Sequence, residues 1–159
     1  GDLDDEVDPS PQTLALKWIL GDPEVEAYDD WRILQRYAMA TIYYSTGGPN
    51  WYEKTNWLSY AHHENDWSWS VPLDSFNVDL VNDLFDDALE HIRGSHKDEV
   101  SHLWLANNGL TGTIPPEVSL LASLVVIDIV NNEIGGTIPT ELGHLEKLRA
   151  LISHANALT

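Results

Sequence analysis

Apolar positions in the second half of the chain recur at a fixed spacing of 24 residues. When the chain is aligned with itself at this spacing, Asn108, Asn132 and Asn156 fall into one column. The pattern predicts stacked repeat units, about two and a half of them between residues 99 and 159. The other columns are Val100/Leu124/Leu148, Leu103/Ile127/Leu151, Leu110/Ile134/Leu158, Gly112/Gly136, Ile114/Ile138, Pro115/Pro139, Glu117/Glu141 and Leu121/Leu145.

Each unit is expected to contain one short strand. Because side chains alternate between the two faces of a strand, Leu103 and Leu105 should both point inward. The same alternation directs Ile127 and Ile129 inward in the next unit. These four side chains are therefore predicted to form a core that is covered by the neighbouring units.

The turn after each strand is expected to be closed by an asparagine. An amide side chain carries two donors and an acceptor, so Asn108, Asn132 and Asn156 can satisfy backbone groups beyond the reach of the strand ladder. The glycine that follows relieves steric strain where the chain turns back, and the Ile-Pro pair favours an extended return. We therefore assign these asparagines a structural role.

The opposite face of the strands is the candidate binding surface. A solvated sheet face is normally polar, whereas Trp104, Val126, Val130 and Ile152 make this face largely apolar. Such a patch marks a contact surface, and we predict that a partner protein binds there. The alternative is that the cap or an insertion before the repeats folds over the face. The predicted partner-binding residues are His102, Trp104, Ala106, Asn107, Val126, Asp128, Val130, Asn131, Ile152 and His154.

The first 71 residues have the pattern of a helical region. Ser10-Pro11 provides an N-cap and a first helical position for a segment that closes at Gly21-Asp22-Pro23. A second helix is predicted from Asp29 or Asp30 to Ser45, with apolar residues at helical spacing and Gly47-Gly48 after its end. Residues 10–71 are therefore predicted to form a cap, preceded by an acidic disordered tail at residues 1–9.

An insertion separates the cap from the repeats, at residues 72–98. Its middle part is predicted to form an amphipathic helix, because Leu80, Leu84 and Ile92 lie on one face and Asp79, Asp83 and Glu90 on the other. The repeats follow at residues 99–159.

Two phrases of the repeat, LTGTIPPEV at residues 110–118 and GGTIPTEL at residues 135–142, resemble plant-type leucine-rich repeats. The segment TGGPNWYEKTNWLS resembles the N-terminal cap of such proteins, and SPQTLALKWIL upstream is most like the caps of diatom and algal repeat proteins. The resemblance implies an α/β fold, with a helical N-terminal cap followed by a short right-handed solenoid and a parallel concave sheet. Caps of this kind usually carry cysteines, which are absent here, so we expect the cap to be held by packing alone.

Composition excludes several classes of partner. The 26 acidic and 8 basic side chains give a net charge of −18, which repels nucleic acids and anionic lipids. No run approaches the roughly 20 apolar residues of a membrane-spanning helix. The resemblance implies an extracellular or lumenal location, whereas the absence of cysteine and of Asn-x-Ser/Thr sequons fits a lumenal or intracellular protein better than a heavily modified secreted one.

Candidate catalytic and metal-binding motifs are few. His62-His63-Glu64 lacks the spacing of a metal site, and the acidic runs lack the loop pattern of a calcium site. The chain has no GxSxG motif and no phosphate-binding loop. We therefore predict no catalytic residues, no metal and no cofactor, and we assign most of the seven tryptophans to the core of the cap.

The sequence thus predicts a non-catalytic module that binds a partner protein through the outward strand face. One alternative is a structural accessory subunit of a larger, for instance membrane-bound, assembly. A third hypothesis is a carbohydrate-active enzyme with paired acids. The third repeat unit is incomplete, so we expect further repeats or another chain to cover Leu148, Leu151 and Leu158.

Overall fold

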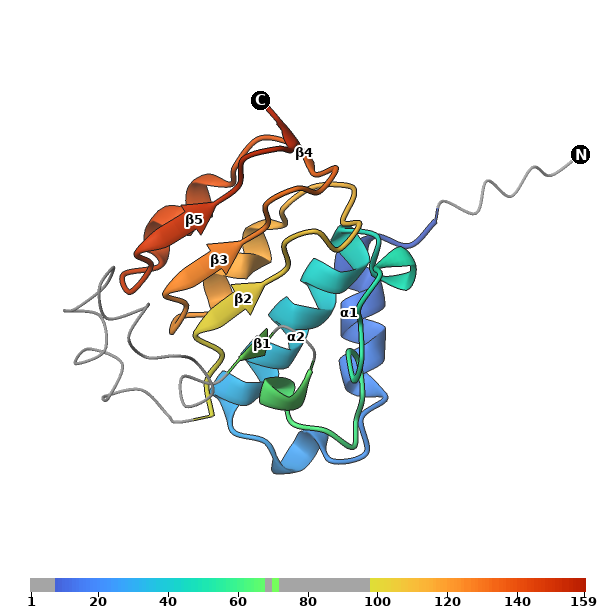
Figure 1. Ribbon diagram of the computed structural model, residues 1–159. Helices are drawn as coiled ribbons and strands as arrows, with labels where there is room; N and C mark the ends of the chain where they lie inside the picture. Colours follow the sequence, from blue (N-terminus) through green and yellow to red (C-terminus); the bar gives the residue numbers. More distant parts are fainter. Residues whose placement is uncertain (1–7, 68–69, 72–97) are drawn as a thin grey trace, which may run out of the picture.

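The computed structural model describes residues 8–67, 70–71 and 98–159. Figure 1 shows a helical region at one side and a series of short parallel strands at the other. The predicted acidic tail lies outside the described residues except for its last two positions. The helix predicted within the insertion, and Trp69, also lie outside them.

We call residues 10–71 and the elements within them the cap. The two helices of this segment have the predicted bounds. Helix α1 (Pro11–Leu20) has Ser10 as its N-cap and Gly21 as its C-cap. The Ser10 hydroxyl accepts a hydrogen bond from the Thr13 N–H at 3.2 Å. Helix α2 (Asp30–Ser45) is followed by Gly47 at a φ of 70°, a left-handed conformation that favours glycine. Three short 3₁₀ helices, η1 (Val25–Ala27), η2 (Gly48–Asn50) and η3 (Glu64–Asp66), complete the cap.

The strands among the described residues form two small sheets. The first sheet has the order β1 (Ser70–Val71), β2 (His102–Trp104), β3 (Val126–Asp128) and β5 (Ala150–Ile152). Strands β2, β3 and β5 are parallel, and their register pairs His102 with Val126 and Val126 with Ala150, as the 24-residue spacing predicts. Strand β1 joins the edge of β2 in the antiparallel direction. The second sheet pairs β4 (Gly135–Gly136) with β6 (Ala157–Leu158).

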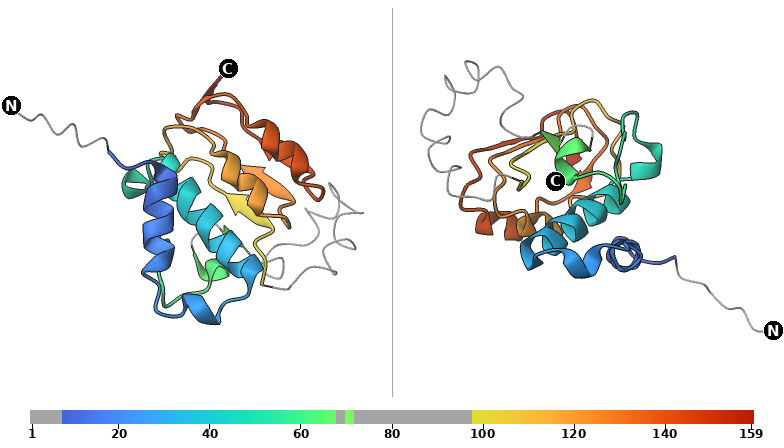
Figure 2. Two further views of the ribbon diagram at one scale, coloured as in Figure 1. Left: turned by 180° about the vertical axis from the view of Figure 1, so that it is seen from behind. Right: turned by 90° about the horizontal axis from the view of Figure 1, so that it is seen from below.

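Helical elements line the side of the repeats that is opposite the four-stranded sheet. The 3₁₀ helices η5 (Pro116–Leu120) and η6 (Thr140–His144) follow one another behind the sheet, and α2 packs against η5. Seen from behind, α1, α2, η5 and η6 form a row (Figure 2). The fold is therefore a mixed α/β arrangement in which the helices of the cap extend the helical side of the repeats.

The core lies between the sheet and this row of helices. The four predicted inward residues, Leu103, Leu105, Ile127 and Ile129, are all buried in one apolar cluster, so the predicted strand alternation is confirmed. Helix α2 contributes three buried side chains to the same cluster, at the end of the repeats that faces the cap. They are Ala38, Met39 and Ile42. At the other end Leu148, Leu151 and Leu158 pack on the cluster but are only partly buried.

The asparagines of the column hydrogen-bond to the backbone around them, which is the arrangement that a structural role requires. The Asn132 Oδ1 accepts hydrogen bonds from the backbone N–H groups of Asn108 and Leu110, both at 3.0 Å. The Asn132 Nδ2 donates to the carbonyls of Leu105 and Ile129 at 2.8 and 2.9 Å. One amide thus joins two neighbouring units. Asn108 makes equivalent bonds to the backbone of Glu53, which extends the column into the cap.

We expect Asn132→Ala to lower the free energy of unfolding by about 2–3 kcal/mol, because buried backbone donors and acceptors of two units lose their partner. Asn156→Ala should cost about 1 kcal/mol, since Asn156 is only partly buried and its partners can bond to water. Urea denaturation of the two variants beside the parent tests this. Equal losses at both positions would contradict the role assigned to burial.

A buried cluster of charged side chains links segments of the cap, so the prediction that the cap is held by packing alone is wrong. The side chains of Arg36, Asp22 and Glu64 are all 0% exposed, and Arg36 forms ion pairs with both carboxylates. The Arg36 guanidinium also lies 4.9 Å from the centre of the Trp18 ring. Burial of this guanidinium is tolerated because carboxylates and an aromatic ring surround it. The cluster joins α2 to the segments on either side of it without any disulfide.

Candidate functional site

The outer face of the sheet formed by β2, β3 and β5 is the candidate functional site, which we call the outer face. Exposure on this face increases along the direction of the strands. In the first unit His102 is buried, Trp104 and Ala106 are partly exposed, and Asn107 is exposed. The second unit shows the same gradient, from the buried Val126 to the exposed Asn131. In the third unit Ala150 and Ile152 are both partly exposed, and His154 is exposed. The predicted surface is therefore closed at the N-terminal ends of β2 and β3 and open toward the C-terminal ends of the strands.

Two of the predicted partner-binding residues are not accessible. His102 is 5% exposed and Val126 is 1% exposed, although both point away from the main core. Val126 belongs to a second, smaller cluster with Val125, against which Trp104 and Ala150 pack. The prediction that His102 and Val126 belong to an exposed surface is therefore wrong. Alternation identifies the side of the sheet on which a residue lies, but it does not report what covers that side.

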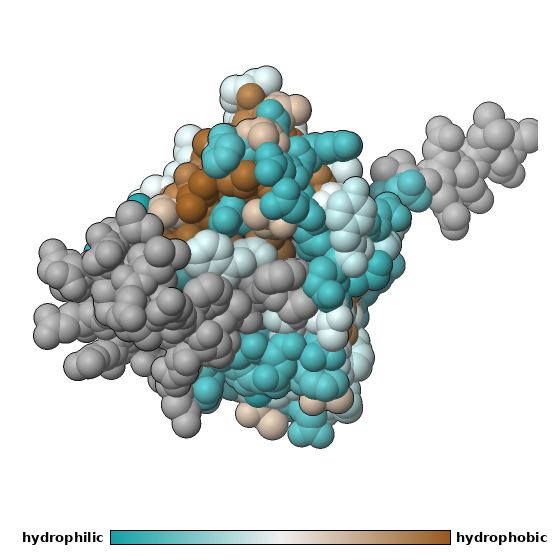
Figure 3. Space-filling view, viewed as in Figure 1, coloured by the Kyte–Doolittle hydropathy of each residue, from teal (hydrophilic) through white to brown (hydrophobic). Residues whose placement is uncertain are grey.

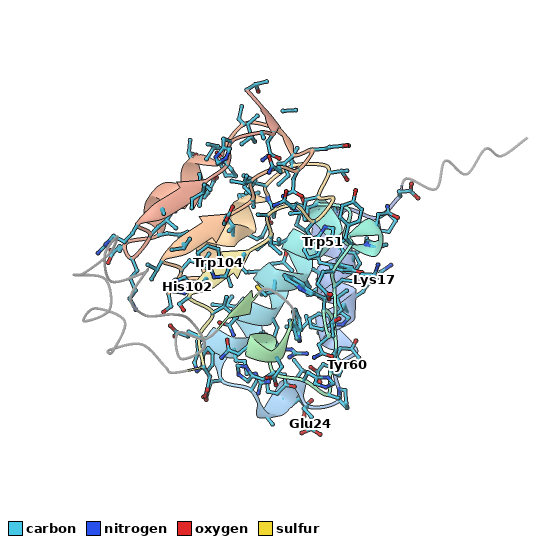
Figure 4. The ribbon with its side chains drawn as sticks, viewed as in Figure 1. Lys17, Glu24, Trp51, Tyr60, His102 and Trp104 are labelled. Atoms are coloured by element: carbon cyan, nitrogen blue, oxygen red, sulfur yellow. The ribbon has the colours of Figure 1, made fainter. Side chains whose placement is uncertain are left out.

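Burial also affects the chemistry of His102. Loss of solvent lowers its pKa below the ordinary value of 6.5, so the imidazole is neutral at neutral pH. The ring lies almost parallel to that of Trp104, with 5.9 Å between their centres and 12° between their planes (Figure 4). Its Nδ1 also lies 2.9 Å from the Ser101 hydroxyl. His102 therefore supports Trp104 from the closed side of the outer face.

Trp104, Asp128 and Ile152 form a row across the middle of the outer face, which we call the central row. The register pairs Trp104 with Asp128 and Asp128 with Ile152. All three side chains are partly exposed. The Asp128 Oδ1 accepts a hydrogen bond from the backbone N–H of Val130 at 3.1 Å, which orients the carboxylate. An aromatic ring, a carboxylate and an aliphatic side chain thus lie next to one another on adjacent strands.

Asparagines form the open edge of the outer face. Asn107 and Asn131 have φ angles of 54° and 53°, and the Asn131 Nδ2 donates to the Asn107 Oδ1 at 3.0 Å. Asparagine tolerates this left-handed conformation better than most residues. The third unit has Ala155 at the same position, with a φ of 56°. His154, beside it, is exposed, and its carbonyl accepts a hydrogen bond from the Asn131 N–H.

The cap contributes one exposed aromatic residue near this edge that the sequence analysis did not select. Tyr52 is 82% exposed, and its ring packs against Gly109, the residue that follows Asn108. Its backbone N–H donates to the Asn108 carbonyl at 3.1 Å. Nothing in the local pattern of TGGPNWYEK distinguishes this tyrosine from a core aromatic, since its position depends on a contact between distant segments.

The space-filling view shows hydrophobic residues gathered on one part of the surface. In Figure 3, hydrophobic residues gather between β3 and the C-terminal end, with hydrophilic residues around them. Val130 and Ile152 of the outer face lie in this part of the chain, as do the partly buried Leu151 and Leu158.

The other candidate motif has a structural explanation. The His63 Nδ1 accepts a hydrogen bond from the Asn65 N–H at 3.2 Å and caps η3, and Glu64 belongs to the charged cluster. The His62 Nδ1 lies 2.8 Å from the Ser59 hydroxyl. Within residues 8–67, 70–71 and 98–159, no three acidic, histidine or cysteine side chains are grouped so that they could hold a metal. The same residues include no helix that is long and apolar enough to cross a membrane.

Comparison with known proteins agrees with the repeat assignment. A family model described as Leucine Rich Repeat matches residues 99–121 and 123–145. The two matched stretches begin 24 residues apart and contain the first two units. The prediction of leucine-rich repeats is thereby confirmed for this part of the chain. A search of curated proteins found no match to the chain.

Proposed function

We propose, from the leucine-rich repeats that the chain carries at residues 99–145, that it is a non-catalytic module that binds a partner protein. Repeats of this family generally mediate contacts between proteins, because stacking of the units creates an extended surface that is suited to binding. We further propose that the repeats are of the plant type, that they form a short right-handed solenoid behind an N-terminal cap, and that the outer face is its concave side.

The observation that carries this proposal is the composition of the open part of the outer face. Trp104, Val130 and Ile152 are partly exposed there, with the exposed asparagines along one edge. Aromatic and aliphatic side chains bordered by polar groups are typical of protein interfaces, and tryptophan is frequent among the residues that contribute most of the binding energy. The remaining predicted partner-binding residues, Ala106, Asn107, Asp128, Asn131 and His154, surround these three.

Trp104→Ala is expected to weaken partner binding by about 2 kcal/mol, which is roughly a thirtyfold change in affinity. The parent, Trp104→Ala and Leu120→Ala would each be immobilised separately. Leu120→Ala is the matched control, because it shortens a 37% exposed leucine of η5, on the opposite side of the repeats. Proteins from the native source that the parent and the control retain, and that Trp104→Ala loses, are candidate partners. Near-ultraviolet circular dichroism reports whether each variant is folded.

The proposal fails if folded Trp104→Ala retains the same proteins as the parent, or if the Leu120→Ala change removes them instead. Unfolding of Trp104→Ala would show that the residue is part of the core. Ile152→Ser, which changes the same row at the edge strand β5, then provides the second test of the outer face.

A second candidate function is that of an accessory subunit in a larger assembly. The feature that favours it is the side of the third unit that faces away from the cap, where Leu148, Leu151 and Leu158 are only partly buried. A neighbouring chain in such an assembly would bury these side chains. Purification from the native source at a fixed stoichiometry that high salt does not change would favour this function over reversible binding of a soluble partner.

A further inference from the structure

We propose that the central row, Trp104, Asp128 and Ile152, is a subsite for a cationic side chain, preferentially arginine, that the partner protein presents on an extended segment. This inference rests on the proposed function and specifies the chemistry of the partner. The outer face then recognises a particular side chain in addition to offering apolar area.

The first argument is the geometry of the central row. Neighbouring strands lie about 4.8 Å apart, so the three side chains that the register aligns stand next to one another. One oxygen of Asp128, Oδ1, is held by the Val130 N–H at 3.1 Å. The other oxygen, Oδ2, has no hydrogen bond to any residue that the structure describes. Among these residues Oδ2 thus has no donor, and it belongs to a row with an aromatic ring and an aliphatic side chain.

The second argument is that no cation within the described part of the chain serves Asp128. All four ion pairs found there belong to the cap. Arg149, which precedes β5, donates from Nη1 to the carbonyls of Glu146 and Leu148. The Lys147 Nζ lies 3.3 Å from the Ser123 hydroxyl, which in turn bonds to Glu99. The basic side chains that lie nearest among the described residues thus contact other groups, and none of them forms an ion pair with Asp128.

The third argument concerns the kind of cation. A guanidinium can donate two parallel hydrogen bonds to a carboxylate and can lie flat against an indole at the same time, whereas an ammonium group acts as a point charge. The same combination already occurs inside this molecule. Arg36 pairs with Asp22 and Glu64 while its guanidinium lies over the rings of Trp18 and Trp67, at 4.9 and 5.6 Å.

The direction of approach follows from the exposure gradient. His102 and Val126 close the N-terminal side of the central row, whereas Asn107, Asn131 and His154 are exposed on the other side. A side chain therefore enters from the asparagine edge, where amides can bond to the backbone that carries it. The net charge of −18 adds a long-range attraction for a cationic segment and increases its rate of association.

The probes that test this inference are three peptides, Ac-Ser-Gly-X-Gly-Ser-NH₂, in which X is arginine, leucine or citrulline, the neutral counterpart of arginine. Binding is measured from the ¹H–¹⁵N signals of the Trp104 indole and of the β3 and β5 amides. We expect the arginine peptide to bind at least about tenfold more tightly than the citrulline peptide. Asp128→Asn, which retains an oxygen for the Val130 N–H, should remove this preference.

The matched control is Glu133→Gln, which changes the net charge equally at an exposed position after the same strand. It should alter the affinity for the arginine peptide less than about twofold. If Asp128→Asn and Glu133→Gln reduce the affinity for the arginine peptide equally, the attraction is a general effect of charge and the inference is wrong. Equal affinities for the arginine and citrulline peptides, or no binding of any peptide, would also overturn it. If Asp128→Asn does not fold, the affinities of the parent protein for the arginine and citrulline peptides test the inference by themselves.

These outcomes are separable from failure of the proposed function. If the leucine peptide binds most tightly and Asp128→Asn leaves its affinity unchanged, the outer face is an apolar interface and only the cationic subsite is wrong. If Trp104→Ala retains every protein that the parent retains, the proposed function itself is wrong, whatever the peptides show.

Discussion

Replacing Gly112 with alanine is expected to lower the free energy of unfolding by about 3–5 kcal/mol, whereas the same change at Gly136 should cost about 1–2 kcal/mol. The two glycines occupy one column of the repeat and have almost the same backbone conformation, with φ angles of 68° and 71°. The conformational penalty for alanine is therefore similar at both positions. The expected difference comes from what a Cβ atom would contact.

At Gly112 a Cβ would lie 2.2 Å from the carbonyl oxygen of Ser45, at the end of α2. This backbone cannot move without disturbing the contact between the cap and the first repeat unit, where Thr111 and Thr113 donate to the carbonyls of Thr46 and Ser45. At Gly136 the nearest atom would be Cγ2 of Thr113, at 3.1 Å. A side-chain methyl group can shift by a few tenths of an ångström, so only the conformational penalty remains.

Urea denaturation followed by circular dichroism, on the parent and both alanine variants, measures the difference. Ser45→Gly serves as a further control, because it removes the hydroxyl that donates to the Thr113 carbonyl and leaves the Ser45 carbonyl in place. It should not rescue Gly112→Ala. Similar losses for Gly112→Ala and Gly136→Ala would mean that the cap does not approach the first unit as closely as the structure shows.

Arg36→Met is expected to cost about 3–5 kcal/mol, because it leaves the carboxylates of Asp22 and Glu64 buried without their common cation. Methionine retains much of the apolar stem of arginine, so the loss would reflect the charge more than the volume. Arg32→Met is the matched control. The Arg32 side chain is 24% exposed and pairs with Glu64 from the edge of the cluster at 3.4 Å, so its replacement should cost about 1 kcal/mol.

The double variant Arg36→Met/Glu64→Gln separates the effect of charge from that of packing. If an uncompensated carboxylate causes the loss, neutralising Glu64 should recover part of the stability, and the double variant should unfold at a higher urea concentration than Arg36→Met alone. Additive losses from the two changes would show instead that the hydrogen bonds and packing of Arg36 matter more than its charge.

The helices and the repeat spacing could be predicted from the sequence because their signals are local. Ser10 and Gly21 delimit α1 through the hydrogen-bonding and conformational preferences of single residues, and the structure has the helix at Pro11–Leu20. The identity of the inward residues followed from strand alternation. The roles of Asn108 and Asn132 followed from the fact that a repeated, buried amide has to be satisfied by the backbone around it.

The charged cluster of the cap was not predicted. Asp22, Arg36 and Glu64 are separated along the chain by loops and a helix, and each taken alone reads as a solvated surface residue. Their ion pairs exist only because the cap brings the loop before α2 and the segment around η3 to the same side of that helix. The signal that could have indicated them is Arg36 itself, since it falls among the buried positions of α2, where an arginine requires partners.

Sequence patterns alone were thus sufficient to predict the cap helices, the 24-residue units, the inward side chains and the asparagine column, because each has a local or a repeated signal. Which part of the outer face is open depended on the tertiary structure, since alternation assigns His102 and Val126 to this face, whereas they are 5% and 1% exposed. The tertiary structure likewise decided that Gly112, but not Gly136, lies against a carbonyl of the cap. Periodicity assigns a residue to a face, whereas accessibility and ion pairing depend on contacts between segments that are distant in the chain.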